Sequence, residues 1–519
     1  MPLPADNTPW PPAGWAPVFS DMCLWAAWWE GDTQKLWDAY HASPNVYTPG
    51  TVRTGLRDFV KRMFWGRETS GTRNRPSRGD LHVPIATDLC ATSADTLYSQ
   101  PPTITSDSAA TQDQINQYID DGLYEQFITG AETGAALGGR YHRVTWDTRL
   151  QDRPFITTVD ADSALPEFTW GRLTAVTFWT VIERDGGTLY RHLERHELTP
   201  SGMGITIHAL YEGTGDNLGK RIPLASHEAT RPLGLTLASD GTVPGPYTPG
   251  LNVVYIPNAT PQRKWRKHTT ACHLGRSDLD GCESLMDALD ETYSSWMRDI
   301  RLGKARVFAD RSMLETPYPT GIRAAAFDLD QEVFTPLENM TGSMADQLPI
   351  VPQQFAIRVA EHQQTVSDLV RRIVRTARYS TATFGEDVDD TDITATEVKA
   401  RQRATATTRD RKIRLEKPAV RALVEKMLTV DHAVFHQPGI QAGTVQVDFP
   451  SFLEQDTSQL AQTAATLKQA GIASLQTAIQ LVHPDWDTDR VEQEAKAIHS
   501  EQPLSSPDTW RMPTDTDDE

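Results

Sequence analysis

Apolar side chains recur every three or four positions in the first part of the chain, a spacing that predicts helices. From Ser20 to Ala42 the stripe is rich in tryptophan, and Gly31 is placed to split it. We interpret this stripe as packing on the protein's own body rather than as a groove for a partner. The same spacing predicts helices over 55–66, 80–99 and 111–138.

From Arg140 the apolar period shortens to two, which is typical of strands. Strands are predicted over 141–147, 173–184, 188–198, 204–211 and 251–256. Asp185-Gly186-Gly187 separates two of these strands and predicts a hairpin. An antiparallel β region enclosed by helices places the protein in the α+β class.

Two long amphipathic helices are predicted after Pro261, separated by an insert rich in proline and glycine. The first covers 278–301, with Ser277 as its N-cap and Gly303 as its stop. The second covers 353–378 and becomes basic at its end. Because their apolar stripes are narrow, we expect this pair to form a stalk that needs neighbours, such as a ring of identical copies.

An acidic loop follows the second long helix, and a third long helix follows the loop. Thr394 and Glu397 form a capping box that opens this helix, which runs to about Val430. Pro418 should kink or divide it, and its basic residues, including Arg409 and Lys412, are expected on an exposed or subunit-contacting face. A strand at 444–449 and helices at 456–470, 474–482 and 487–500 complete the ordered part before an acidic tail.

The 519 residues carry a formal net charge of −19 at pH 7, with a pI near 5.2 and a mean hydropathy of −0.46. This length suggests about three domains. An acidic total argues against tight, sequence-independent DNA binding, although it is compatible with a protein along which DNA slides. The four cysteines, the missing apolar span and the missing signal peptide predict a soluble cytoplasmic protein with buried thiols and no membrane association.

Catalytic chemistry finds little support in the sequence. Gly215–Arg221 departs from a phosphate loop in its glycine spacing and in lacking Ser or Thr after the lysine, so a surface turn is favoured. His192 and His196 stand four apart, but in a predicted strand, and His268, Cys272 and His273 lack a fourth ligand at a zinc spacing. We therefore predict no enzyme and no cofactor, with a zinc-dependent hydrolase and a non-channel structural adaptor as the alternatives.

Several short motifs resemble, in order and spacing over about residues 80–500, the portal proteins of tailed bacteriophages, of the siphovirus type found in phages of actinobacteria. Those motifs are V-P-I-A-T-D-L-C (Val83–Cys90), S-Q-P-P (Ser99–Pro102), G-R-S-D-L (Gly275–Leu279), D-A-L-D-E-T-Y-S (Asp287–Ser294), T-A-T-E-V-K-A-R (Thr394–Arg401) and A-G-I-A-S (Ala470–Ser474). The Trp-rich start and the acidic tail match nothing typical of the family.

The resemblance implies a dodecameric ring with an α/β wing, a long-helix stem, a small α/β clip and a helical crown. Carried over by position, the parts are the wing at 1–275, the stem at 276–303 and 353–378, the clip at 304–352, the tunnel loop at 379–393, the long wing helix at 394–432, the crown at 440–500 and a disordered tail at 501–519. The ring would occupy one capsid vertex of the virion, after assembly in the host cytoplasm.

The resemblance also implies a channel for DNA packaging and ejection. Its partners would be double-stranded DNA, the terminase large subunit, a head–tail adaptor, and the major capsid and scaffolding proteins. The DNA-facing residues of the tunnel loop would be Phe384, Glu386, Asp387, Asp389, Asp390 and Asp392, whose carboxylates repel phosphates. Contacts between stems would come from Leu285, Leu289, Trp296, Arg371, Arg372 and Arg375.

Overall fold

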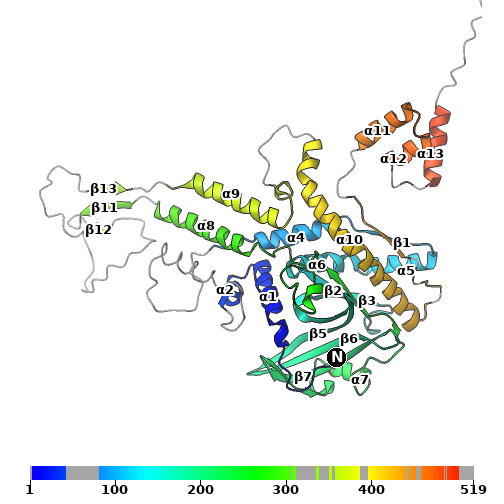
Figure 1. Ribbon diagram of the computed structural model, residues 1–519, viewed down its shortest axis with the longest axis horizontal. Coiled ribbons are helices and arrows are strands. Elements are labelled where there is room, and N and C mark those ends of the chain that lie inside the picture. The colour runs from blue at the N-terminus through cyan, green and yellow to red at the C-terminus, as the bar shows by residue number, and fades with distance from the viewer. Residues whose placement is uncertain are drawn as a thin grey trace, which may run out of the picture. The chain divides into compact units, whose positions relative to one another are not determined.

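The computed structural model divides the chain into two compact units, Met1–Pro450 and Ser451–Glu519 (Figure 1). It describes residues 3–41, 81–303, 306–310, 335–337, 350–353, 357–385, 395–437, 439–441, 443, 445–451, 457–483, 486 and 488–501. The predicted helix 55–66, most of the predicted clip and the acidic tail lie outside these residues.

Helices and strands alternate irregularly in the first unit, as the α+β class predicts. Its longer helices are α1 (Ala16–Glu30), α2 (Thr33–His41), α4 (Ile85–Tyr98), α5 (Ala109–Asp120), α6 (Leu123–Leu137), α7 (Arg231–Thr236), α8 (Glu283–Leu302), α9 (Val359–Thr376) and α10 (Ala395–Val434). Gly31 and Gly122 adopt positive φ values of 67° and 95°. These left-handed residues end α1 and separate α5 from α6, so the single helix predicted over 111–138 is two helices.

The larger sheet is antiparallel, in the order β4–β5–β6–β7–β8, with β9 paired to β7. Its strands are β4 (Ala164–Thr169), β5 (Arg172–Asp185), β6 (Thr188–Leu198), β7 (Met203–Thr214), β8 (Asn217–Ile222) and β9 (Thr248–Pro249). Gly186, with φ of 59°, turns β5 into β6 and confirms the predicted hairpin.

The described residues of the first unit also form three smaller sheets. They comprise β10 (Val253–Pro257) with β2 (Gly139–Thr145) and β3 (Phe155–Asp160); β1 (Thr103–Ser106) with β14 (Val445–Asp448); and β11 (Arg306–Asp310) with β12 (Thr335–Leu337) and β13 (Ile350–Gln353). Because Thr103 is paired with Asp448, the strand near 445 belongs to the first unit. The crown predicted at 440–500 thus begins ahead of this strand, whereas the second unit begins at Ser451.

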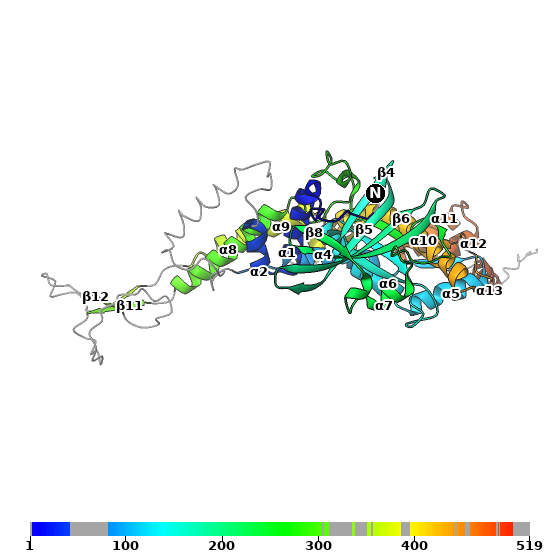
Figure 2. The same cartoon turned by 90° about the horizontal axis from the view of Figure 1, so that it is seen from below.

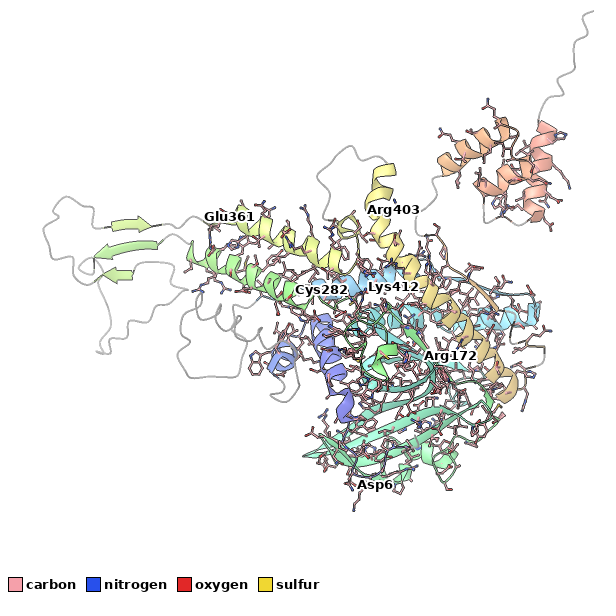
Figure 3. All side chains as sticks on the ribbon, in the orientation of Figure 1. Asp6, Arg172, Cys282, Glu361, Arg403 and Lys412 are labelled. Atoms are coloured by element: carbon pink, nitrogen blue, oxygen red, sulfur yellow. The ribbon has the colours of Figure 1, made fainter. Side chains whose placement is uncertain are left out.

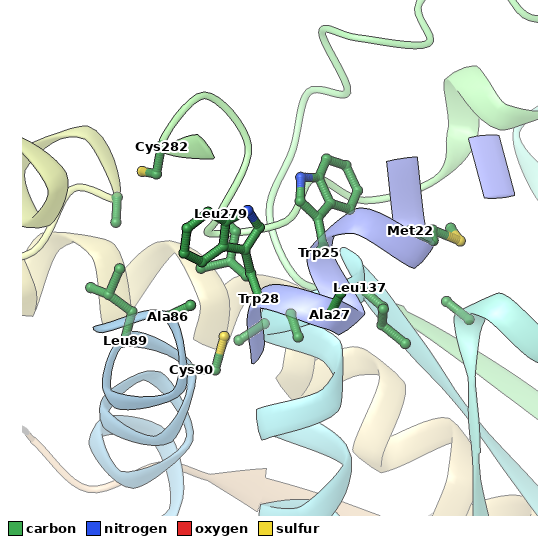
Figure 4. Packing of buried hydrophobic residues seen from close by; sticks show 14 of the residues in the cluster. Met22, Trp25, Ala27, Trp28, Ala86, Leu89, Cys90, Leu137, Leu279 and Cys282 are labelled. Atoms are coloured by element: carbon green, nitrogen blue, oxygen red, sulfur yellow. The ribbon is translucent and has the colours of Figure 1, made fainter. Parts of the chain in front are cut away.

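The tryptophans of α1 lie inside the protein. Trp25 and Trp28 are fully buried among residues of α4 and the segment before α8, including Leu89 and Leu279 (Figure 4). The Trp25 indole N–H donates to Glu283 Oε1 at 3.0 Å, so its polar atom is also satisfied. The interpretation of this stripe as packing on the protein's own body is confirmed for α1, whereas Trp37 of α2 is 44% exposed.

The second unit is helical where it is described, with α11 (Thr457–Gln469), α12 (Leu475–Val482) and α13 (Thr488–Glu501). Ser474 caps α12 by accepting the Thr477 N–H at 3.2 Å. These bounds agree closely with the three predicted helices. Among the described helices of both units, none has the length and apolarity that a bilayer crossing needs.

The 40-residue helix α10 continues through Pro418, so the predicted division of this helix is wrong. Its basic face is also not generally exposed, because Arg409 and Lys412 are buried. Lys412 (Figure 3) donates from Nζ to Asp278 Oδ2 at 2.6 Å, Asn258 Oδ1 at 2.7 Å and Ser93 Oγ at 2.6 Å. Three acceptors match the three protons of an ammonium group, which is the condition for burying it.

A second buried ion pair lies one helical turn further along α10. Glu416 accepts two hydrogen bonds from the Arg140 guanidinium, at 2.9 and 2.8 Å, and a third from the Tyr98 hydroxyl at 2.9 Å. Both partners are almost completely buried. This bidentate pair joins α10 to β2 and α4 in a single geometry.

We predict that Lys412→Ala lowers the free energy of unfolding by about 3–5 kcal/mol, because it leaves the Asp278 carboxylate buried without a cation. Urea unfolding followed by circular dichroism measures the loss. The matched control is Lys417→Ala on the same helix, where an exposed pair with Asp448 at 2.7 Å should contribute about 1 kcal/mol at most. Equal, small losses in both variants would contradict a structural role for the buried pair.

Candidate functional site

The candidate site consists of α8 and α9, the two helices predicted as a stem, and the segment that joins α9 to α10. The two stem helices lie side by side (Figure 1, Figure 2), with α8 leaving the body of the first unit and α9 returning to it. Helix α8 begins at Glu283 rather than at 278, and its N-cap residue is Cys282. The predicted cap, Ser277, instead donates to the Ala136 carbonyl at 2.5 Å and fastens the entry of the stem to α6.

Apolar residues of α8 and α9 form the seam of the stem close to the body. Met286, Leu289 and Ile373 are fully buried there. Leu289 is thus buried by residues of its own chain, whereas Leu285 and Trp296 are half-buried. The Trp296 ring stacks on His362 across the seam, with centroids 5.9 Å apart and planes inclined by 8°.

Polar contacts hold the stem at the end far from the body. Asp299 of α8 accepts hydrogen bonds from Arg358 at 2.9 Å and from His362 at 3.0 Å. The bond from His362, supported by Arg358, holds the Asp299 pKa below its ordinary value against the opposing effect of burial. The carboxylate therefore joins both helices where the insert begins and ends.

The three arginines predicted at stem contacts lie on the exposed side of α9. Arg372 donates to Asp368 at 2.8 Å on the same helix. Arg371 and Arg375 form no ion pair with any residue that the structure describes. Two unpaired guanidinium groups on consecutive turns make this part of the stem locally cationic.

The chain leaves α9 through Arg378, whose φ is 70°, and then attaches to α10. Tyr379 is buried and its hydroxyl donates to Asp278 Oδ2 at 3.0 Å, so it joins the Lys412 cluster. The Ser380 N–H donates to Thr405 Oγ1 at 2.9 Å, and Thr408 Oγ1 donates to the Arg378 carbonyl at 2.6 Å. The first residues of the predicted tunnel loop are thus fixed to the long helix.

Phe384 lies at the end of a short 3-10 turn, Thr381–Phe384. It is half-buried, with its ring 6.3 Å from Tyr379 at an interplanar angle of 83°. The acids predicted to face DNA lie outside the described residues; they are Glu386, Asp387, Asp389, Asp390 and Asp392. The threonines that anchor this segment carry no sequence signal, because a hydroxyl on a helix usually faces solvent or its own backbone.

The histidines considered for zinc are not brought together as a metal site. His192 and His196 lie on strand β6, where four residues span about 13 Å. His192 Nε2 lies 3.1 Å from His208 Nδ1, and His196 Nε2 lies 2.7 Å from Glu194. The described part of the chain contains no group of three or more potential ligands that could hold a metal ion.

The second histidine cluster, His268 and His273 with Cys272, likewise forms no metal site among the described residues. His268 interacts with the Gly14 carbonyl at 2.9 Å, away from any shared ligand set. All four cysteines are free thiols; Cys90 and Cys282 are buried, but Cys23 is exposed, contrary to the expectation that each thiol is buried. Gly215 and Asp216 form the hairpin turn between β7 and β8, as predicted, but Asn217–Arg221 belongs to strand β8, so the surface turn is confirmed only at its start.

A protein-family model described as "Phage portal protein, SPP1 Gp6-like" matches residues 72–504. The chain belongs to this portal protein family. It is accordingly a phage portal protein, a structural component of the virion at the capsid vertex and not an enzyme. The zinc-hydrolase alternative is therefore wrong, in agreement with the scattered histidines.

Solved structures of gene transfer agent (GTA) particles are similar to this portal protein. A chain from the neck of an empty GTA particle is 13% identical, with a TM-score of 0.42, covering 80% of this chain and 95% of that one. A chain from the neck of a native particle is 12% identical, with a TM-score of 0.37 and coverages of 77% and 90%. A chain from the native virion is 12% identical, with a TM-score of 0.36 and coverages of 81% and 97%. Comparison with curated proteins finds no match.

We predict that the far end of the stem loosens in acid through Asp299. Because its folded pKa is depressed, the carboxylate contributes stability above the pKa of an unfolded aspartate and loses that contribution as the pH falls through the folded value. Hydrogen exchange should show protection of 299–303 and 358–362 falling with the pH. Asp299→Asn should lower stability by about 1 kcal/mol and remove the pH dependence.

Asp368→Asn is the matched control for this prediction, since Asp368 forms an exposed pair with Arg372 within α9 alone. It should leave exchange at both segments unchanged. A pH profile that persists unaltered in Asp299→Asn would show that another group controls this end of the stem.

Proposed function

We propose that this portal protein assembles into a dodecameric ring of the siphovirus type, with α8 and α9 as its stem. The observation that carries the proposal is that Arg371 and Arg375 on α9 remain exposed and form no ion pair with the described residues, while Leu285 and Trp296 of α8 are only half-buried. Acidic groups on a neighbouring stem would neutralise these arginines, and a closed ring gives every copy such a neighbour.

The remaining parts are assigned by position. The body of the first unit with α10 corresponds to the wing, 304–352 to the clip, and α11, α12 and α13 to the crown. The tunnel loop starts after Phe384 rather than at 379, because residues 379–384 are bonded to α10. Its acids would line the channel and repel the phosphates of passing DNA, which keeps the duplex from adhering to the wall.

The proposal includes the partners of the ring. The near-miss phosphate loop is a hairpin turn followed by strand β8, which favours a separate ATP-driven terminase large subunit as the motor that packages DNA. The clip would receive that terminase during packaging and a head–tail adaptor afterwards, while the wing would contact the major capsid and scaffolding proteins.

Purified protein imaged by negative-stain electron microscopy should show twelvefold rings with an axial hole, and native mass spectrometry should give the mass of twelve copies. Monomers at every protein and salt concentration would contradict the ring. A defined assembly without an axial hole would favour the non-channel adaptor.

We predict that Glu386→Lys, Asp387→Lys and Asp389→Lys together leave ring formation intact but slow DNA packaging at least tenfold, because lysines bind the phosphates that acids repel. An in vitro packaging assay with the cognate motor measures the rate. The matched control places the same charge change at Asp515, Asp517 and Asp518 of the acidic tail and should package normally. Unchanged packaging in the first variant would refute the tunnel assignment.

A further inference from the structure

Trp170 occupies an unusual position at the tip of the β4–β5 hairpin. Its side chain is 98% exposed, and it shares a two-residue turn with Gly171, at φ values of 53° and 75°. Two positive φ values define a type I′ turn, for which Asn-Gly is the preferred pair. A bulky side chain is unfavourable at positive φ and an exposed indole is poorly hydrated, so hairpin folding does not account for this tryptophan.

Basic residues follow Trp170 in the chain and lie on a loop that contacts its hairpin. Arg172 follows the turn and is exposed. The loop 262–273 reaches the hairpin, where the rings of Phe168 and His273 are 5.3 Å apart, and it exposes Arg266 and Lys267. These three cations form no ion pair with the residues that the structure describes. We call Trp170 and Arg172 the knob.

An open cavity of about 470 Å³ lies between the α5–α6 turn, the start of β3 and α10. Its apolar lining includes Tyr118, Leu123, Phe155, Ile156 and Met427. This volume falls in the range of sites that hold drug-sized groups, so it accommodates an indole.

The rim of the cavity is acidic and has an apolar lip. Asp121 and Glu125 are exposed there; Asp121 is paired with Arg153, whereas Glu125 forms no ion pair with any described residue. Leu150, which also lines the cavity, is 74% exposed. The cavity thus offers what the knob lacks, namely apolar cover for an indole and a carboxylate for an arginine.

The knob and the cavity lie on opposite sides of the first unit. In Figure 2, β4 lies at the upper side, whereas α6, whose first turn lines the cavity, lies at the lower side. Trp170 is 98% exposed, so it does not fill the cavity of its own chain. Complementary surfaces on opposite sides join copies head to tail, and such contacts close into a ring when the rotation between copies permits.

We propose that Trp170 of one copy inserts into the Tyr118–Met427 cavity of the next copy, with Arg172 facing the Glu125 rim. The contact rests on the proposed ring and identifies one of its interfaces, outside the stem. It is a heterologous contact, so each copy uses its knob once and its cavity once.

Trp170→Asn and Leu150→Asp test the two halves of this contact separately. Trp170→Asn installs the residue that the turn prefers, so the monomer should unfold at the same or a higher temperature. Each variant should raise the protein concentration at which half the chains are in rings by at least tenfold, as measured by mass photometry. The matched control is Leu235→Asp, since Leu235 is an 82% exposed leucine on α7, away from the cavity lining, and it should assemble as the wild type does.

Mixing the two variants gives a sharper result. Trp170→Asn retains an intact cavity, and Leu150→Asp retains an intact knob. One knob–cavity contact can therefore form between the two variants, and no further copy can be added through this contact. Native mass spectrometry should show heterodimers in the mixture that neither variant forms alone, and 1 M salt should weaken them because the rim is charged.

Each outcome decides the contact separately from the ring. If both variants assemble into rings at the same protein concentration as the wild type, the contact is overturned and the ring stays in place. Wild-type chains that associate through Trp170 into open chains would support the contact and contradict the ring. Rings of Trp170→Asn that assemble normally but fail to enter capsids would overturn the proposal in favour of a capsid protein as the occupant.

Discussion

The position of the stem depends on one buried charge. The Lys412 ammonium must keep all three of its hydrogen-bond acceptors, because a desolvated cation without them costs more than the fold can offset. Those acceptors lie on α4, on the loop after β10 and on the segment that enters α8, and Tyr379 adds the residue that leaves α9. Both connections of the stem therefore meet at one point of α10, and neither can shift while the other stays in place.

Apolar and polar contacts have different roles in this arrangement. Apolar residues such as Met286 and Ile373 hold the two stem helices together, but such contacts tolerate sliding because they are not directional. The Lys412–Asp278 and Arg140–Glu416 pairs are directional, and they set the register of α10 against α4, β2 and the base of the stem. Hydrogen bonds from Thr405 and Thr408 fix the segment 378–384 in the same position relative to α10.

The long periodic elements are predictable from the sequence, and the elements that depend on distant partners are not. Strand 188–198 and helices α11, α12 and α13 match their predicted ranges because their patterns are local. Strand β1 has four residues and exists through pairing with Val445–Asp448, more than 300 positions away. For the candidate site, periodicity locates both stem helices. It does not predict that Leu289 is buried within the chain while Leu285 is only half-buried. The burial of Lys412 escapes prediction, because charge patterning alone assigns a lysine to a surface.

The pairing of β1 with β14 has an evolutionary consequence. Strand β14, close to the end of the first unit, pairs with Thr103–Ser106 of β1, and that unit ends at Pro450. The chain after Pro450 forms a separate unit, joined to the first by a single passage of the backbone. A recombination event at that junction exchanges the terminal helices while leaving every buried pair of the first unit intact. The terminal helices can therefore change without disturbing the packing of the first unit.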